Sequence, residues 1–264
     1  MSRRVSSAKA GWLTALPFAH RGLHDGNRSV PENSLAAARA AVAAGYGIEC
    51  DLQVCTDGVP IVFHDNSLNR ITGRKSGSIS SRTSAFLTQL DLGSGKRICK
   101  LEDALVQLIP RIPVNIEMKF NHLHYRPLVF AVLELLDKHQ AQGDVLISSF
   151  FHQSLEILNR KNPQVPTAPL FGKMTGAPHD DDLKRISKYR KHWNNNLPFE
   201  HPAAVVACDM IDKDMVKRFK KAKLTLLTYT VDEPEEMERL ADLGVDGIIT
   251  NRPDRLDKFL YQRG

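Results

Sequence analysis

Residues 47–64 read GIECDLQVCTDGVPIVFH, two apolar, strand-like runs separated by a short polar connection. The connection is shorter than the roughly twelve residues that a parallel crossover needs, so the two runs must pair as an antiparallel hairpin. Asp57 and Gly58 favour a two-residue type I′ turn, since both central positions of that turn need positive φ. Such a turn predicts that His64 lies directly opposite Asp51.

Seven further apolar runs share this character and mostly alternate with stretches of helical periodicity. The alternation predicts a parallel sheet covered by helices. Nine runs less the return strand of the hairpin leave eight parallel strands, as in a closed (β/α)8 TIM barrel, although an open doubly wound sheet would show the same alternation. The runs lie at residues 17–20, 47–53, 60–64, 113–119, 144–150, 167–171, 204–209, 224–230 and 246–250.

Length and composition favour one globular domain. The chain has 264 residues, which suits a single barrel of about 250, so we expect one domain over residues 1–264. Residues 66–99 are rich in Ser, Thr, Gly and Arg and are expected to form a small insertion at the barrel rim. Four scattered cysteines without a CxxC pair predict reduced thiols and a cytoplasmic protein.

The net charge of +6 is compatible with nucleic acid, an anionic membrane or small anionic substrates. No nucleic-acid-binding motif accompanies the charge, so no nucleic-acid partner is expected. Basic residues are densest at 184–193 and 213–223, where their helical spacing favours solvated helix faces. Weak contact of residues 184–193 with an anionic membrane is the alternative.

Carboxylates, histidines and cations gather at the predicted strand ends. Alternate residues of a strand share a face, so Glu49 and Asp51 point the same way, as do Glu117 and Lys119. Loops at the C-terminal strand ends carry the active site of a barrel. The candidate residues near these ends are His20, Arg21, Glu49, Asp51, His64, Glu117 and Lys119.

Each of these residues also has a structural explanation. A histidine at a strand end is more often a hydrogen-bonding group than a catalyst, and carboxylates in a barrel can pair with Lys119. However, burying so many charges without a ligand would be costly, and clustered carboxylates at neutral pH need protons or a cation between them. Oxygen ligands favour a hard divalent ion over zinc: Mg²⁺ or Ca²⁺, with Mn²⁺ as a further candidate.

Six stretches form a more specific pattern. They are AHRG at 19–22, VPENSLAAARAAVAAG at 30–45, IECDLQVCTDGVPIVFHDNSLNRITG at 48–73, VNIEMK at 114–119, ISSF at 147–150 and LLTYTVDEPEEMERLADLGVDGIITNRPD at 226–254. In this order and spacing they resemble the glycerophosphodiester phosphodiesterase family, and the resemblance covers most of the chain. It implies a (β/α)8 barrel with a small insertion after His64 and Asp65.

The resemblance also implies roles for single residues. Tyr229 departs from the family's pattern, which often has Trp there, and this concerns how the substrate is packed. The implied roles are metal ligation by Glu49, Asp51 and Glu117, catalysis by His20 and His64, phosphate contact by Arg21 and Lys119, and substrate packing by Phe150 and Tyr229. Groups without a match, expected to be structural or on the surface, are His24, Asp25, His122, His124 and His152.

The implied reaction is hydrolysis of a glycerophosphodiester to sn-glycerol 3-phosphate and an alcohol. His20 as base and His64 as acid is the preferred assignment, with the reverse left open. The nucleophile is either water or the substrate's own 2-hydroxyl. Two alternatives are a lysophospholipase D or sphingomyelinase D-like activity on acyl-bearing phosphodiesters, and a non-catalytic barrel that binds phosphate esters. The intact set of histidines and carboxylates argues against the non-catalytic alternative.

Overall fold

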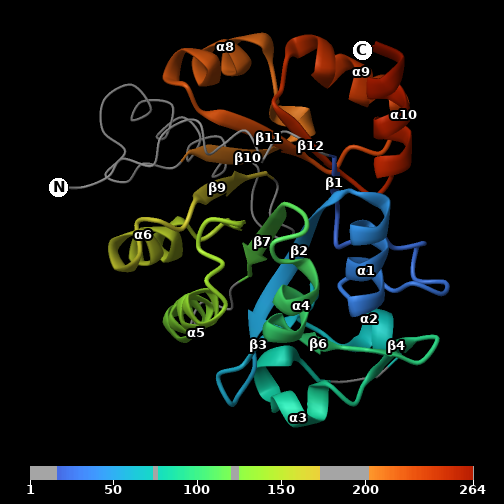
Figure 1. The fold of residues 1–264 in the computed structure, drawn as a ribbon, viewed down its shortest axis with the longest axis vertical. Coiled ribbons are helices and arrows are strands. Elements are labelled where there is room, and N and C mark those ends of the chain that lie inside the picture. Colours follow the sequence, from blue (N-terminus) through green and yellow to red (C-terminus); the bar gives the residue numbers. More distant parts are fainter. Residues whose placement is uncertain (1–16, 74–76, 120–124, 173–201, 264) are drawn as a thin grey trace.

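Eight parallel strands close into a barrel in the computed structural model, which describes residues 17–73, 77–119, 125–172 and 202–263 (Figure 1). The first strand pairs with both the second and the last, which closes the ring and excludes the open sheet. The predicted (β/α)8 barrel is therefore confirmed. Its strands are β1 (Phe18–Ala19), β2 (Gly47–Val54), β7 (Val114–Met118), β8 (Val145–Ser149), β9 (Thr167–Phe171), β10 (Ala203–Ala207), β11 (Thr225–Tyr229) and β12 (Gly247–Thr250).

Helices form the outer layer and follow most of the strands. The first of them begins where the Ser34 hydroxyl accepts a hydrogen bond from the Ala37 N–H, and ends at Gly45 in a left-handed conformation. No helix in the described ranges is both long and apolar enough to cross a membrane. The longer helices are α1 (Leu35–Ala44), α4 (Leu101–Leu108), α5 (Tyr125–Lys138), α6 (His152–Lys161), α8 (Lys213–Ala222), α9 (Pro234–Leu243) and α10 (Pro253–Arg263).

Strand alternation divides the core into an outer and an inner layer. On β2, Ile48, Cys50 and Leu52 face the helices and join the largest apolar cluster. Each fully buried Leu or Ile side chain in that layer contributes roughly 1.5–3 kcal/mol to stability. The barrel interior is filled by a separate, smaller cluster of Phe18, Leu146, Ala168, Leu170, Ala203, Val205, Leu227 and Ile249. Glu49 and Asp51 point to this inner side, because strand alternation turns them away from the face that carries Ile48, Cys50 and Leu52.

β3 (Pro60–Val62) runs antiparallel to β2, as the short connection requires. The predicted register is wrong by one residue, because the Phe63 N–H donates to the Asp51 carbonyl at 2.9 Å and Phe63, rather than His64, lies opposite Asp51. Since β3 ends at Val62, His64 belongs to the following loop, and the loop rather than strand alternation directs its side chain.

The turn explains the error in register. Gly58 has a φ of 79° and its N–H donates to the Cys55 carbonyl, whereas Asp57 does not share the positive φ of a type I′ turn. The Cys55 N–H donates in turn to the Val59 carbonyl, which leaves a three-residue loop with a left-handed glycine at its end. Such a loop shifts the pairing by one position relative to the two-residue turn.

The polar stretch after the hairpin builds a small subdomain-like layer beside the barrel (Figure 1). It contains α2 (Asn69–Thr72), a 3-10 turn η3 (Ile79–Ser81), α3 (Ser84–Leu87), β4 (Asp91–Gly93) and β5 (Lys96–Arg97), and β6 (Cys99–Lys100) then pairs with β3. Apolar side chains hold the layer against the hairpin: Ile61, Phe63, Leu68, Ile79, Leu87, Leu92 and Ile98.

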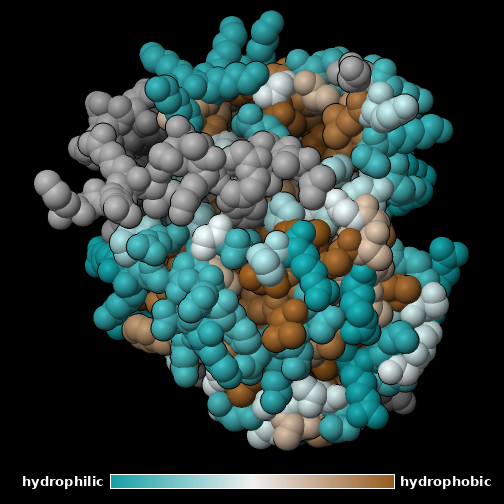
Figure 2. All heavy atoms as spheres, in the orientation of Figure 1, coloured by the Kyte–Doolittle hydropathy of each residue, from teal (hydrophilic) through white to brown (hydrophobic). Residues whose placement is uncertain are grey.

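The structure describes only one of the two basic stretches. Residues 184–193 lie outside the described ranges. Residues 213–223 correspond to α8, whose Met215, Val216 and Phe219 are buried, while its lysines face outward. Figure 2 shows hydrophilic side chains over α8 and much of the outer layer, with apolar side chains visible between the elements. The basic residues of α8 therefore form a solvated helix face.

Candidate active site

Three carboxylates from two neighbouring strands meet at one end of the barrel. Glu49 and Asp51 lie on β2 and Glu117 on β7, where Asp51 and Glu117 are paired in register. One oxygen from each carboxylate lies within 4.8 Å of the others, a spacing that could hold a metal ion. Only 3% of Glu49 and 1% of Asp51 are exposed, so the group is withdrawn from bulk water.

The three carboxylates differ in the direction in which their surroundings shift the pKa. Burial and the charges of Asp51 and Glu117 raise the pKa of Glu49 well above its usual value, and burial also raises the pKa of Glu117. Burial would raise the pKa of Asp51 too, but the positive charge of Lys119, with smaller contributions from its other neighbours, outweighs it and lowers the pKa. Glu49 Oε1 is buried and has no hydrogen-bond partner within the described residues. A buried acceptor without a donor, beside two further carboxylates, fits a cation site.

Two cationic side chains border the carboxylates. Lys119 Nζ lies 3.1 Å from Asp51 Oδ1 and 2.8 Å from Glu117 Oε1. Arg21 has a φ of 57°, and its backbone N–H donates to Glu49 Oε2 at 3.0 Å. Its guanidinium lies 3.5 Å from Asp51 Oδ2. Arg21 and Lys119 therefore lie where the sequence predicted them, beside the acidic group.

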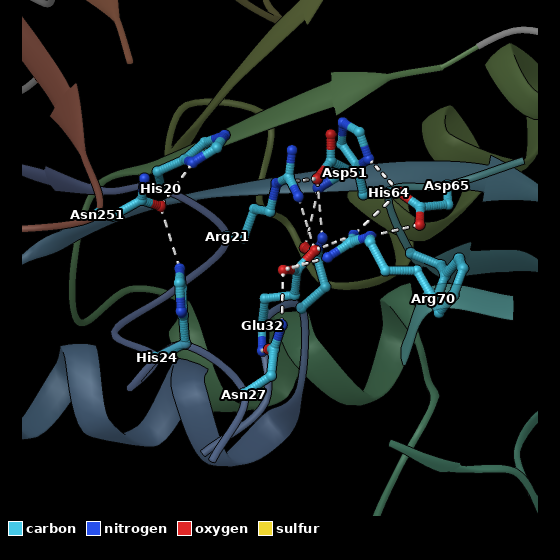
Figure 3. Close-up of polar contacts among 12 residues, drawn as sticks. His20, Arg21, His24, Asn27, Glu32, Asp51, His64, Asp65, Arg70 and Asn251 are labelled. Atoms are coloured by element: carbon cyan, nitrogen blue, oxygen red, sulfur yellow. Dashed lines mark hydrogen bonds and ion pairs between the residues drawn. The ribbon is translucent and has the colours of Figure 1, made fainter. Parts of the chain in front are cut away.

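Both predicted histidines reach this end of the barrel, and in Figure 3 they flank Arg21 and Asp51. His20 Nε2 lies 3.9 Å from Glu49 Oε2. Burial and the charge of Arg21 lower the pKa of His20 to about 4, so its ring is neutral at neutral pH. His64 Nδ1 lies 2.6 Å from Asp65 Oδ1.

The sequence did not reveal a set of polar side chains that contact Arg21, Asp51 and Asp65. Glu32 accepts hydrogen bonds from Arg21 at 2.7 Å and from Arg70 at 2.7 and 3.0 Å. Arg70 also donates to Asp65, while Asn33 donates to Asp51 Oδ2 at 2.8 Å (Figure 3). The only sequence signal was VPENS at 30–34, where acidic and amide residues precede the Ser34 helix cap.

The two aromatic residues that were predicted to pack against the substrate, Phe150 and Tyr229, lie at the C-terminal ends of their strands. Phe150 follows β8, Tyr229 ends β11, and both are partly buried with ring centroids 6.3 Å apart. The Tyr229 hydroxyl donates to the Phe171 carbonyl at 3.2 Å. Both rings pack against the apolar interior of the barrel.

The residues expected to be structural or on the surface have varied surroundings. Asp25 accepts hydrogen bonds from the backbone N–H groups of Arg28, Ser29 and Val30, and His152 Nε2 lies 3.0 Å from the Leu170 carbonyl. Both roles are structural. His24 is closer to the site than expected, because it shares a hydrogen-bonding partner with His20. His122 and His124 lie outside the described residues.

Comparisons with known proteins identify the family of this chain. The model of the glycerophosphoryl diester phosphodiesterase family matches residues 20–255. The chain is 30% identical over 263 residues to a glycerophosphodiester phosphodiesterase of Caldanaerobacter subterraneus, covering 96% of this chain and all of the relative. It is also 30% identical over 252 residues to an enzyme of the same name from Bacillus altitudinis, covering 92% of this chain and 96% of that one.

A solved structure supports the fold. It is an Oleispira antarctica phosphodiesterase in complex with its product sn-glycerol-3-phosphate, with a TM-score of 0.79. The alignment covers 94% of this chain and 98% of that chain at 24% sequence identity. The shared architecture therefore extends over nearly the whole of both chains.

Proposed function

Because the chain belongs to the glycerophosphoryl diester phosphodiesterase family, we propose that it hydrolyses glycerophosphodiesters to sn-glycerol 3-phosphate and an alcohol. The observation that carries the proposal is the cluster of Glu49, Asp51 and Glu117, bordered by two cations and two histidines. The product bound to the Oleispira antarctica phosphodiesterase supports this substrate class. Residues 1–264 are proposed to act as one barrel domain, with residues 66–99 as an insertion.

Glu49, Asp51 and Glu117 would hold a divalent cation, Mg²⁺ or Ca²⁺, with Mn²⁺ as a further candidate. The all-oxygen donor set and the unpartnered Glu49 Oε1 support a hard ion. When bound, such an ion acts as a Lewis acid toward a phosphate oxygen. Lys119 contacts two of the same carboxylates and so offsets part of their charge.

Arg21 and Lys119 would bind the phosphate of the substrate. Arg21 is held by Glu32 through one terminal nitrogen, and its Nε lies 3.5 Å from Asp51 Oδ2 without a hydrogen bond to the described residues, so the guanidinium would present its positive charge to the phosphate beside Asp51. Lys119 adds a second positive charge in a buried site, where it counters negative charge on the phosphoryl oxygens more effectively than in water. Phe150 and Tyr229 would pack against the apolar parts of the glycerol or headgroup.

The hydrogen-bonding partners of the histidines support His20 as base and His64 as acid. His20 is paired with a neutral amide and has a pKa lowered to about 4, so its Nε2 can accept a proton from the nucleophile, either water or the substrate's 2-hydroxyl. His64 Nδ1 lies 2.6 Å from Asp65 Oδ1, so Nε2 is the ring nitrogen that remains to donate to the leaving group. His64 then gives its proton to the leaving alkoxide as the P–O bond breaks.

The test is a coupled assay for glycerol 3-phosphate release from several glycerophosphodiesters, run in parallel with Mg²⁺, Ca²⁺ and Mn²⁺. We expect release from at least one headgroup, loss of activity in EDTA, and little turnover of lysophosphatidylcholine. Turnover of the lysophospholipid alone would instead favour the activity on acyl-bearing substrates. Absence of release across all headgroups and metals would contradict the proposed function.

A further inference from the structure

The loop after β12 holds an asparagine whose amide orientation is fixed by an aspartate. Asn251 donates through its backbone N–H to Asp232 Oδ1 at 2.8 Å and through Nδ2 to Asp232 Oδ2 at 2.7 Å. The Thr250 hydroxyl donates to Asp232 Oδ1 at 3.0 Å. An ionised carboxylate only accepts hydrogen bonds, so the amide nitrogen of Asn251 must face Asp232 and the amide oxygen must face away from it.

That amide oxygen faces two histidines from the other end of the chain (Figure 3). His20 Nδ1 lies 2.8 Å and His24 Nε2 lies 3.1 Å from Asn251 Oδ1. The Gly26 N–H donates to His24 Nδ1, so in the neutral ring of His24 the hydrogen is on Nε2 and is donated to Asn251. This contact supports the same amide orientation independently of Asp232.

The orientation determines which nitrogen of His20 carries hydrogen. Because Asn251 Oδ1 can only accept, His20 must present an N–H at Nδ1. A neutral His20 ring then has a bare Nε2, and this is the nitrogen that lies 3.9 Å from Glu49 Oε2, on the side of the carboxylate cluster. The opposite amide orientation would place the hydrogen on Nε2 and leave no lone pair facing the site.

We propose that Asp232 and Asn251 are positioning residues, which hold His20 in the Nδ1–H tautomer so that Nε2 can take a proton. The inference rests on the proposed function, in which His20 acts as the base. Asp232 precedes α9 and Asn251 follows β12, so the last strand and its neighbour orient a side chain that follows the first strand. This links the two ends of the chain where the barrel closes.

Exchange of the two side chains provides a matched test. In Asp232→Asn, the new amide nitrogen faces the Asn251 amide, which must turn over, and His20 is then driven to the Nε2–H tautomer. The double variant Asp232→Asn with Asn251→Asp restores both polarities, because the new amide donates to the new carboxylate, which again accepts from His20. Asp246→Asn is the control, since Asp246 accepts a backbone N–H from Leu226 at the opposite end of the strands.

For Asp232→Asn we expect kcat to fall about 100-fold or more, as is typical when a catalytic histidine is held in the wrong tautomer, with KM changed less than about threefold. The double variant should regain at least tenfold in kcat, and Asp246→Asn should match the wild type. Thermal unfolding of all variants shows whether each is folded. Wild-type kcat in a folded Asp232→Asn, or no recovery in a folded double variant, would overturn the proposal.

A second measurement works without activity or metal. Nitrogen-15 NMR of the histidine rings, with His20 assigned by a His20→Gln variant, should show hydrogen on Nδ1 of neutral His20 in the wild type and on Nε2 in Asp232→Asn. An Nε2–H tautomer in the wild type would refute the inference even if no variant folds. If the wild type hydrolyses no glycerophosphodiester, the proposed function fails, while the ring tautomer still decides whether Asn251 orients His20.

Discussion

Glu49→Gln should stabilise the metal-free protein while weakening its affinity for divalent cations. Glu49 is 3% exposed, and its Oε1 has no donor within the described residues. A buried acceptor left unpaired costs about 1–3 kcal/mol. The amide keeps an oxygen for the Arg21 N–H and turns an N–H toward the neighbouring carboxylates. We therefore expect the free energy of unfolding in EDTA at neutral pH to rise by about 1–3 kcal/mol.

The increase in the free energy of unfolding of Glu49→Gln should depend on pH. Burial, Asp51 and Glu117 raise the pKa of Glu49 above its usual 4.5, so the folded state binds a proton more tightly than the unfolded state. The stability that Glu49 contributes is therefore complete below its unfolded pKa and is lost as pH rises through the folded pKa. The advantage of Glu49→Gln should accordingly be small near pH 4 and larger at neutral pH, when urea unfolding is compared at the two values in EDTA.

Addition of Mg²⁺ or Ca²⁺ completes the experiment. A ligand that binds only the folded state raises Tm according to its affinity, so the cations should raise the Tm of the wild type more than that of Glu49→Gln. Glu102→Gln is the control, because Glu102 pairs with Lys138 on the surface of α4 and should leave the response to cations unchanged. An equal cation response in Glu49→Gln and the wild type, or a loss of stability in EDTA at neutral pH, would refute the reasoning.

Three further changes test other parts of the structure. Lys119→Met removes the buried partner of Asp51 and Glu117, so it should cost about 3–5 kcal/mol in EDTA and make Tm more dependent on cations; an unchanged Tm in EDTA would contradict this. Asp65→Asn removes the carboxylate that pairs with His64 and should lower kcat roughly 10- to 100-fold with little change in KM, as steady-state kinetics would show. Gly58→Ala places a side chain at a φ of 79° and should cost about 1 kcal/mol in urea unfolding without changing kcat; a neutral effect would argue against the left-handed turn.

The sequence predicted those parts of the molecule that depend on local periodicity. Strand alternation placed Glu49 and Asp51 on one face, and the pairing of β2 with β7 brought Glu117 beside them. The hairpin register was wrong because it depends on the conformation of one turn, and a two-residue and a three-residue loop differ little in sequence. His64 does not lie opposite Asp51 as predicted, but it belongs to the loop beyond β3 and still reaches the same end of the barrel.

The polar side chains around the site could not be predicted from local periodicity. They lie in loops and contact partners far away in the sequence. Arg70 reaches Glu32, and Asn251 reaches His20 across 231 residues. No periodic pattern specifies such pairs; they depend on closure of the barrel and on packing of the segment after the hairpin.

These loop contacts give the two candidate histidines different hydrogen-bonding partners. Both rings use Nδ1 for a protein partner, but one partner is the amide of Asn251 and the other is the carboxylate of Asp65. Arg70 donates to Asp65 and so holds that carboxylate in place. If His20 is the base and His64 the acid, as proposed, their different partners come from the loops that follow the strands, without any change in the histidines themselves.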